Sequence, residues 1–355
     1  MNRRRLLAAA AALAAGAACA RPGPSVLLGS AASAGGDGGA AGRAPIPPDR
    51  ARLDALADAA RRTERLRAIV VTVDGEVALA EAFRGPPVDR AVNVKSVSKS
   101  VVAALAGTAI GRGEVPGVDA TLGEVAPGLV PPGADPRVAA LTIEDLLTMR
   151  TGLERQSGAA YGQWASSDDW VAHALTRPFV AEPGGRFLYS TATWHVLGAA
   201  LAEATGKSLL ELARERLGAP LGIDLPAWTR DPQGRYLGGN EMAMTPLAMA
   251  RFGELYRRGG RWGGARVLEE AWTRESLVAR TVSPWSGDAY GYGWFLRELG
   301  GEPAAYARGY GGQLVHVVPG AAAVVAITSD VSRAARGDGY VEALHAMVGR
   351  CVGRG

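Results

Sequence analysis

Ser96 and Lys99 have the residue types and the spacing of a nucleophile and its base. They lie in the stretch NVKSVSKSVVAALAGTAIGRG, residues 93–113. A serine hydroxyl is a poor nucleophile unless a base takes its proton. An amine can take that proton when burial beside the positive N-terminal end of a helix lowers its pKa. The pair would then attack a carbonyl carbon and form an acyl-enzyme.

The choice of lysine at position 99 supports this interpretation. The chain has 39 basic residues, and only three of them are lysine. Arginine cannot lose its proton in a protein, so a titratable amine has to be lysine. A serine three residues before one of three lysines also arises by chance, and the pair alone is therefore a weak motif.

The flanking sequence places the pair at the start of a helix. The extended AVNV precedes Ser96, and the apolar pattern that follows ends at Gly111 and Gly113. A separation of three residues puts Ser96 and Lys99 on one face, in the first turn.

The rest of the folded part predicts an α+β architecture. Residues 49–63 have helical spacing, RAIVVTV reads as a buried strand, and Asp74-Gly75 is a type I′ hairpin signal. Four strand patterns and a closing helix occupy the C-terminal end, whereas helical periods dominate the middle. We therefore expect one antiparallel sheet built from both ends of the chain and flanked by the N- and C-terminal helices.

An all-helical lobe is then inserted between the two halves of the sheet. The expected hydrolase domain spans 49–355, with a sheet lobe at about 49–113 and 286–355 and a helical lobe at about 114–285. The cleft between the two lobes is the expected active site.

Five segments, in this order, resemble the serine beta-lactamase-like hydrolases over roughly residues 49–350. They resemble most closely the class C branch, which includes esterases, D-amino-acid peptidases and aminohexanoate-dimer hydrolases. The resemblance implies a beta-lactamase/transpeptidase-like fold. The segments are NVKSVSKSV, IEDLLTMRTGL, GRFLYSTATWHVLG, GYGWFL and ARGYGGQLVHVVPG.

The resemblance implies a third catalytic residue, Tyr189. In the family a tyrosine of a Tyr-x-Asn element faces the Ser-Lys pair, and Tyr189 in LYSTATWHVLG matches it. A phenol polarised by a nearby ammonium can pass the proton of Ser96 to the leaving group. Thr191 stands where many relatives have asparagine, which removes that amide from substrate recognition.

The resemblance also implies an oxyanion hole on a sheet strand. Tyr310-Gly311-Gly312 replaces the family's Lys-Thr-Gly element, and glycine permits the close approach of a substrate. The backbone N–H groups of Gln313 and Ser96 are the expected donors. The lysine that helps relatives hold a substrate carboxylate is missing. Arg308, two residues before Tyr310, is a partial substitute or a solvated arginine.

These observations favour a serine hydrolase that acts on a carboxylic ester or a small amide without a cofactor. A penicillin-related D,D-peptidase or beta-lactamase and a non-catalytic ligand-binding or sensing module on the same fold stay as alternatives. The histidines lack metal-ligand spacing, and HExxH and CxxC are absent, so no metal is expected. The formal net charge of +4 includes Arg3, Arg4 and Arg5 of the predicted leader, so without residues 1–20 it is +4 − 3 = +1, and this balance does not indicate a nucleic-acid partner. The expected partner is a small-molecule substrate, and no obligate protein partner is evident.

The N-terminus predicts export to the periplasm or the medium. Residues 1–20 join a basic start, a short apolar run and a small-residue cleavage site, as in a signal peptide. Arg3-Arg4 resembles a twin-arginine signal. Cys19 permits the alternative of a lipid anchor and hence a membrane contact. Residues 21–48 read as a flexible Ala/Gly/Pro tether.

Overall fold

The computed structural model describes residues 44–335 and 337–354. The predicted leader (1–20), Cys19 and most of the predicted tether lie outside the described residues. Among those described, no helix combines the length and the apolar character needed to span a bilayer.

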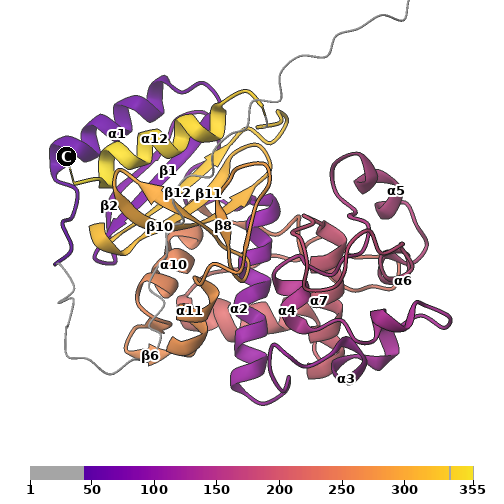
Figure 1. Cartoon of the computed structure of the whole chain (residues 1–355). Helices are drawn as coiled ribbons and strands as arrows, with labels where there is room; N and C mark the ends of the chain where they lie inside the picture. The colour runs from indigo at the N-terminus through magenta and orange to yellow at the C-terminus, as the bar shows by residue number, and fades with distance from the viewer. Residues whose placement is uncertain (1–43, 336, 355) are drawn as a thin grey trace, which may run out of the picture.

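An eight-stranded sheet runs through one side of the molecule in the order β2-β1-β12-β11-β10-β9-β8-β7 (Figure 1). Every neighbouring pair is antiparallel, and β1 pairs with β12 in the register Ile69↔Ile327. The two ends of the chain therefore close one sheet, as predicted. The strands are β1 (Leu66–Val73), β2 (Glu76–Ala82), β7 (Thr281–Val282), β8 (Ala289–Tyr290), β9 (Phe295–Leu299), β10 (Glu302–Gly309), β11 (Gln313–Val318) and β12 (Ala323–Ser329).

Local sequence explains the first hairpin. Asp74 and Gly75 both have positive φ, 49° and 88°, as a type I′ turn requires. Most of β1 is buried, because helices cover the sheet on both faces. This explains why the strand reads as a continuous apolar run without polar alternation.

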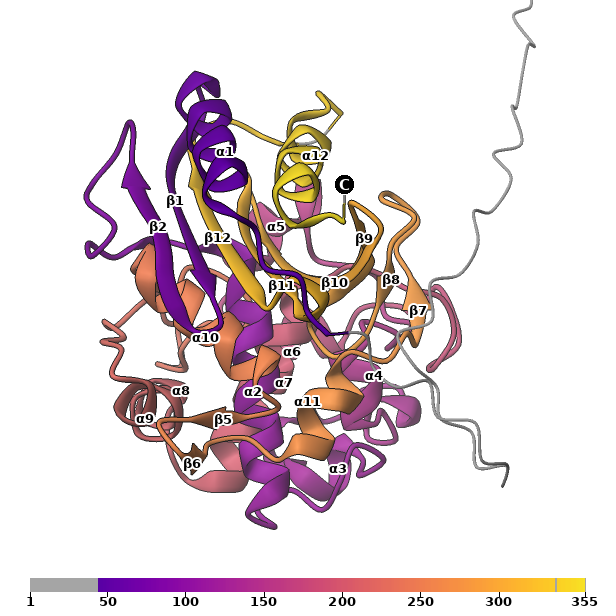
Figure 2. The ribbon, with the colours of Figure 1, turned by 90° about the vertical axis from the view of Figure 1, so that its left-hand side faces the viewer.

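The terminal helices α1 (Arg50–Arg62) and α12 (Tyr340–Val352) pack side by side on one face of the sheet (Figure 2). Asp49 caps α1 by accepting a hydrogen bond from the Arg52 N–H, and the helix buries the apolar stripe that its sequence predicts. The other face is covered by α10 (Pro246–Arg257), which packs on β12, β11 and β1.

The position of α10 differs from the predicted lobe boundaries. Its residues lie within the range 114–285 that was assigned to the helical lobe, yet the helix belongs to the sheet layer. Gly253 allows the contact, because a Cβ there would lie 2.5 Å from the Val324 side chain. An amphipathic pattern predicts a helix with a buried face but not the element that the face covers.

The helical part surrounds α2 (Ser98–Gly111), whose residues 98–109 are all buried. It packs on α7 (Thr191–Thr205). Thr142 and Asp145 form the predicted capping box of α4. The other helices and short ribbons are α3 (Leu122–Val125), α4 (Ile143–Leu147), α5 (Tyr161–Ala165), α6 (Trp170–Leu175), α8 (Leu209–Ala213), α9 (Ala219–Leu221), α11 (Glu270–Ser276), β3 (Val92–Asn93) with β4 (Ala243–Met244), and β5 (Arg261–Trp262) with β6 (Ala265–Arg266).

Candidate active site

Ser96 lies in a 3₁₀ turn, Lys95–Val97, immediately before α2. The turn contacts β10 and β11, so it lies where the helical part meets the sheet. Lys95 has a φ of 52°, a left-handed conformation that is strained for a residue other than glycine. The Asn93 side chain holds this bend by accepting the Lys95 N–H at 2.9 Å. Ser96 therefore projects from a sharp bend and stays partly exposed.

Lys99 lies beside Ser96 with its side chain almost wholly buried. Its Nζ is 2.9 Å from Ser96 Oγ, 2.6 Å from the Gly239 carbonyl oxygen and 3.5 Å from Thr191 Oγ1. Burial lowers the pKa of Lys99, and the neighbouring Tyr189 partly opposes that shift. A neutral amine can donate its two N–H groups to Gly239 and Thr191. Its lone pair then faces the Ser96 hydroxyl, as a general base requires.

Tyr189 completes the predicted group. Its ring centroid is 5.0 Å from Lys99 Nζ. Burial raises the pKa of Tyr189, but the Lys99 charge, hydrogen bonding to Ser96 and Lys99, and the charge of Arg308 outweigh burial and lower it. Met149 holds the segment, because its carbonyl oxygen accepts the Leu188 N–H at 2.8 Å.

Thr191 is brought to the same place but contacts the amine. Its hydroxyl is buried, lies 3.5 Å from Lys99 Nζ and shares a hydrogen bond of 3.0 Å with Ser157 Oγ. Ser157 Oγ also accepts the Thr191 N–H at 2.8 Å. The residue that replaces the family's asparagine therefore contacts the Lys99 amine.

A glycine segment that the sequence analysis did not single out supplies the main acceptor for Lys99. The β3–β4 ribbon and the hydrogen bond from the Val94 N–H to the Met242 carbonyl oxygen (2.9 Å) fix this segment beside Ser96. A Cβ at Gly239 would lie 2.7 Å from Trp194 Cβ. Glu241 pairs with Lys95 at 2.8 Å and thereby neutralises the cation next to Ser96. The adjacent glycines Gly238 and Gly239 are the feature of the sequence that could have indicated this segment.

The end of β10 packs on the Ser96 turn through Gly309. A Cβ at this position would lie 2.3 Å from the Val94 carbonyl oxygen. The predicted glycines lie elsewhere on the turn: a Cβ at Gly311 would meet the Asp330 carbonyl oxygen, and one at Gly312 would meet the Tyr340 ring. The close packing of β10 on the Ser96 turn is thus at Gly309, and the approach of a substrate at Gly311 and Gly312 stays a prediction.

Tyr310 and Gln313 lie at the two ends of this turn. The Tyr310 side chain is half exposed. Gln313 is fully buried, and its side chain donates to the Ser329 carbonyl oxygen at 2.9 Å and accepts the Ser329 N–H at 3.1 Å. The side chain of Gln313 therefore joins β11 to β12, and the role of its backbone N–H as an oxyanion donor stays a prediction.

We expect Gly309→Ala to lower both stability and activity. The added methyl group meets backbone atoms that cannot rotate away, so β10 must move from the Ser96 turn. Overpacking of this kind costs about 1–3 kcal/mol. The measurements are thermal unfolding and kcat/KM for an ester substrate. Gly162→Ala in α5 is the matched control, since a Cβ there meets nothing within 4 Å, and it should change neither quantity. Unchanged activity in Gly309→Ala would contradict this role.

The fold and the site together define a class of protein. An antiparallel sheet with both terminal helices on one face, a helical part beside it and a Ser-x-x-Lys pair where the two meet is the beta-lactamase/transpeptidase-like arrangement. The beta-lactamase family model matches residues 54–346, and the chain therefore belongs to the beta-lactamase family. The predicted family and the predicted fold class are confirmed.

Individual relatives are distant. The chain is 26% identical over 262 residues to the D-alanyl-D-alanine-carboxypeptidase/endopeptidase AmpH of Escherichia coli (strain K12). The aligned region covers 64% of this chain and 66% of AmpH, so the chain spans slightly less than two thirds of the length of that protein. The solved structure of EstCE1, a hydrolase with promiscuous acyltransferase activity, superposes with a TM-score of 0.69 at 19% identity, covering 84% of this chain and 100% of that one. A family VIII carboxylesterase gives a TM-score of 0.67 at 18% identity, covering 86% and 98%.

Proposed function

We propose that the protein hydrolyses a carboxylic ester or a small amide through an acyl-enzyme on Ser96. The observation that carries the proposal is the buried Lys99 amine, 2.9 Å from Ser96 Oγ and with a lowered pKa. Ser96 Oγ bonds to the substrate carbonyl carbon while its proton passes to the Lys99–Tyr189 pair. The tetrahedral intermediate collapses, the leaving group departs with that proton, and water then releases the acid by the same steps.

The oxyanion needs two N–H donors. Ser96 supplies one, since its turn presents the hydroxyl and the amide at the same bend. For the second donor, the resemblance to the family favours the backbone N–H of Gln313. The close packing of Gly309 adds the amide of the next residue, Tyr310, as the alternative on the same turn. Loss of one such donor costs about 2.7–4 kcal/mol of transition-state stabilisation.

The charges around the site favour an ester or a small amide over a penicillin. Lys95 is neutralised by Glu241, and Arg308 donates to the Ala335 carbonyl oxygen at 3.3 Å. The element that replaces Lys-Thr-Gly carries no cation. The similarity to AmpH, a D-alanyl-D-alanine-carboxypeptidase/endopeptidase, supports a peptidase as the second hypothesis. The structural similarity to a family VIII carboxylesterase agrees with the hypothesis that the substrate is an ester.

Three substrates separate the alternatives: p-nitrophenyl butyrate, a peptide ending in D-Ala-D-Ala, and a penicillin. We expect rapid release of p-nitrophenol and slow or no turnover of the other two. Fast acylation by the penicillin with a persistent adduct would instead establish the penicillin-related reading. Binding that raises Tm without any product would establish the ligand-binding module.

Arg155 is expected to select substrates that carry a second, acidic group. Its guanidinium lies 5.1 Å from the ring centroid of the half-exposed Trp285, whose ring in turn contacts Tyr189 at 6.4 Å. Within the described residues no carboxylate lies within ion-pair distance of Arg155, and its buried Nη1 has no hydrogen-bond partner. A carboxylate on the acyl chain of the substrate would supply an ion-pair partner for the guanidinium and a hydrogen-bond acceptor for Nη1.

The test compares p-nitrophenyl monoesters of succinate, glutarate and adipate with p-nitrophenyl butyrate. Arg155→Gln should lower the acidic-to-neutral ratio of kcat/KM by about tenfold for the chain length that reaches it, the equivalent of about 1.4 kcal/mol. Arg308→Gln is the comparison variant and should change the ratio less than Arg155→Gln does, because the Ala335 carbonyl oxygen holds the Arg308 guanidinium although its charge reaches Tyr189. An effect of Arg308→Gln alone would assign the acidic group to the sheet side of the site.

A further inference from the structure

We propose that His195 is a positioning residue for the catalytic amine. With Asp231 it holds the Gly238-Gly239 backbone where the Gly239 carbonyl accepts a hydrogen bond from Lys99. The proposal rests on the proposed function, because that function gives Lys99 the role of the base. His195 itself does not touch the reacting atoms.

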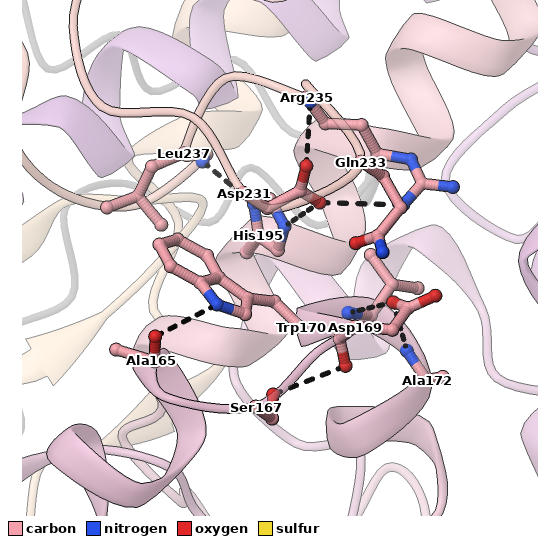
Figure 3. A network of polar contacts seen from close by, with 12 residues as sticks. Ala165, Ser167, Asp169, Trp170, Ala172, His195, Asp231, Gln233, Arg235 and Leu237 are labelled. Atoms are coloured by element: carbon pink, nitrogen blue, oxygen red, sulfur yellow. Dashed lines mark hydrogen bonds and ion pairs between the residues drawn. The ribbon is translucent and has the colours of Figure 1, made fainter.

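His195 and Asp231 form a buried pair within the helical part (Figure 3). Both side chains are fully buried, and His195 Nε2 lies 3.0 Å from Asp231 Oδ2. The Gly238 N–H donates to His195 Nδ1 at 3.4 Å. Since Nδ1 accepts, Nε2 carries the proton and donates to Asp231. The imidazole therefore bridges a carboxylate and a backbone amide in one fixed tautomer.

The surroundings leave this bridge little freedom. The rings of Trp164 and Trp170 pack on His195 with centroid distances of 5.8 and 5.5 Å. The other oxygen of Asp231, Oδ1, accepts the Arg235 N–H at 2.7 Å, which ties the carboxylate to its own loop (Figure 3). Because the His195–Asp231 pair is held in this way, its hydrogen bond also fixes the position of the Gly238 amide.

The next residue connects the bridge to the chemistry. The Gly239 carbonyl oxygen is the nearest acceptor of Lys99 Nζ, at 2.6 Å. The backbone of this segment lies directly on α7, since a Cβ at Gly238 would come within 2.2 Å of the Trp194 carbonyl oxygen. His195, one residue further along α7, thus anchors the segment from the same helix. A shift of the Gly238 amide away from His195 moves the acceptor of the base.

Loss of that acceptor has two consequences for Lys99. The amine gains freedom to rotate, so its lone pair faces Ser96 for less of the time and kcat falls. The ammonium form also loses a hydrogen bond that favours it, so the pKa of Lys99 falls further below its ordinary value. Among the described residues, the other titratable or charged groups around the amine are Tyr189, Arg308, which acts on Tyr189, and the Lys95–Glu241 ion pair beside Ser96. Substitution of His195 removes none of these groups.

Two conservative variants separate positioning from general support of the fold. His195→Gln places an amide nitrogen near the position of Nε2 and keeps the bond to Asp231, but it loses the acceptor for Gly238. His195→Asn places an amide oxygen near Nδ1 and keeps that acceptor, but it loses the donor to Asp231. His345→Gln is the matched control, because His345 is equally buried, bonds His316 at 2.9 Å and lies in α12.

The readouts are kcat, KM and the pH dependence of kcat/KM with p-nitrophenyl butyrate, each measured well below the Tm of the variant. We expect His195→Gln to lower kcat about 10- to 100-fold with KM nearly unchanged. We expect the acid limb of the kcat/KM profile of His195→Gln to move to lower pH by about 0.5–1 pH unit. His195→Asn should be the less stable variant yet retain most of kcat and the position of the limb.

The outcomes are distinguishable from failure of the proposed function. If wild-type activity does not depend on Ser96, the proposed function fails before His195 is tested. If activity depends on Ser96 but both variants lose kcat equally and keep the wild-type acid limb, as a merely structural histidine would, the positioning role is overturned. Full activity in His195→Gln also overturns it.

Discussion

Ser96→Ala is expected to lower kcat/KM for p-nitrophenyl butyrate by about 10⁴-fold or more, because removal of a nucleophile abolishes the covalent route. The substitution removes one oxygen from a partly exposed side chain. Lys99 keeps its bonds to Gly239 and Thr191. The fold should therefore stay intact, with a Tm within a few degrees of the wild type.

The matched control is a serine four residues further along the chain, in α2, whose side chain points elsewhere. Ser100 Oγ donates to the Gly293 carbonyl oxygen at 2.6 Å and is buried. Ser100→Ala should lower stability by about 1 kcal/mol and leave most of the activity in place. Equal activity in the Ser96→Ala and wild-type proteins would remove the basis of the proposed function.

Lys99→Arg is the second large effect. Arginine keeps the positive charge and a comparable length, but it cannot release its proton and therefore cannot act as a base. General-base catalysis contributes about 10²–10⁴-fold, and we expect a loss of that order. The wild-type kcat/KM should rise with pH along a limb that lies below 10.5, the ordinary pKa of lysine, because burial lowers the pKa of Lys99. That limb belongs to the coupled Lys99–Tyr189 pair, and it should vanish in Lys99→Arg.

Lys99→Met separates charge from catalysis. The buried amine has a lower pKa in the folded than in the unfolded chain, so the unfolded chain binds more protons between the two values. Stability of the wild type therefore falls as the pH drops from about 10.5 toward the folded-state pKa. Lys99→Met removes this slope. It should be inactive, yet gain in Tm relative to the wild type as the pH is lowered, a result that thermal unfolding at several pH values would check.

Local signals in the sequence predict much of the fold. Asp74-Gly75 dictates a type I′ turn through its backbone preferences, and the stripe from Leu53 to Ala60 dictates α1. Both are properties of a few adjacent residues. The register of β1 on β12 and the side of the sheet that α10 covers depend on packing between distant segments. Gly253 under Val324 is such a contact, and a periodicity cannot reveal it.

The candidate site likewise combines residues that the sequence predicts with residues that only tertiary packing brings together. Ser96 and Lys99 were predicted from residue type and short spacing, and Tyr189 was predicted from the family resemblance. Tertiary structure brings the Gly239 carbonyl oxygen to the Lys99 amine and the His195 imidazole to the Gly238 amide. Gly309 was not predicted, because the sequence shows it only as one of several glycines near the same turn. Only the packing on the Val94 carbonyl oxygen distinguishes it.

The most direct test of an acyl-enzyme on Ser96 is the mass of the intact protein, quenched in acid milliseconds after mixing with p-nitrophenyl butyrate. The account predicts a transient gain of one butyryl group, located by peptide mapping on Ser96 and absent from Ser96→Ala. A butyryl group on another residue, or rapid turnover with no adduct and an undiminished rate in Ser96→Ala, would contradict it.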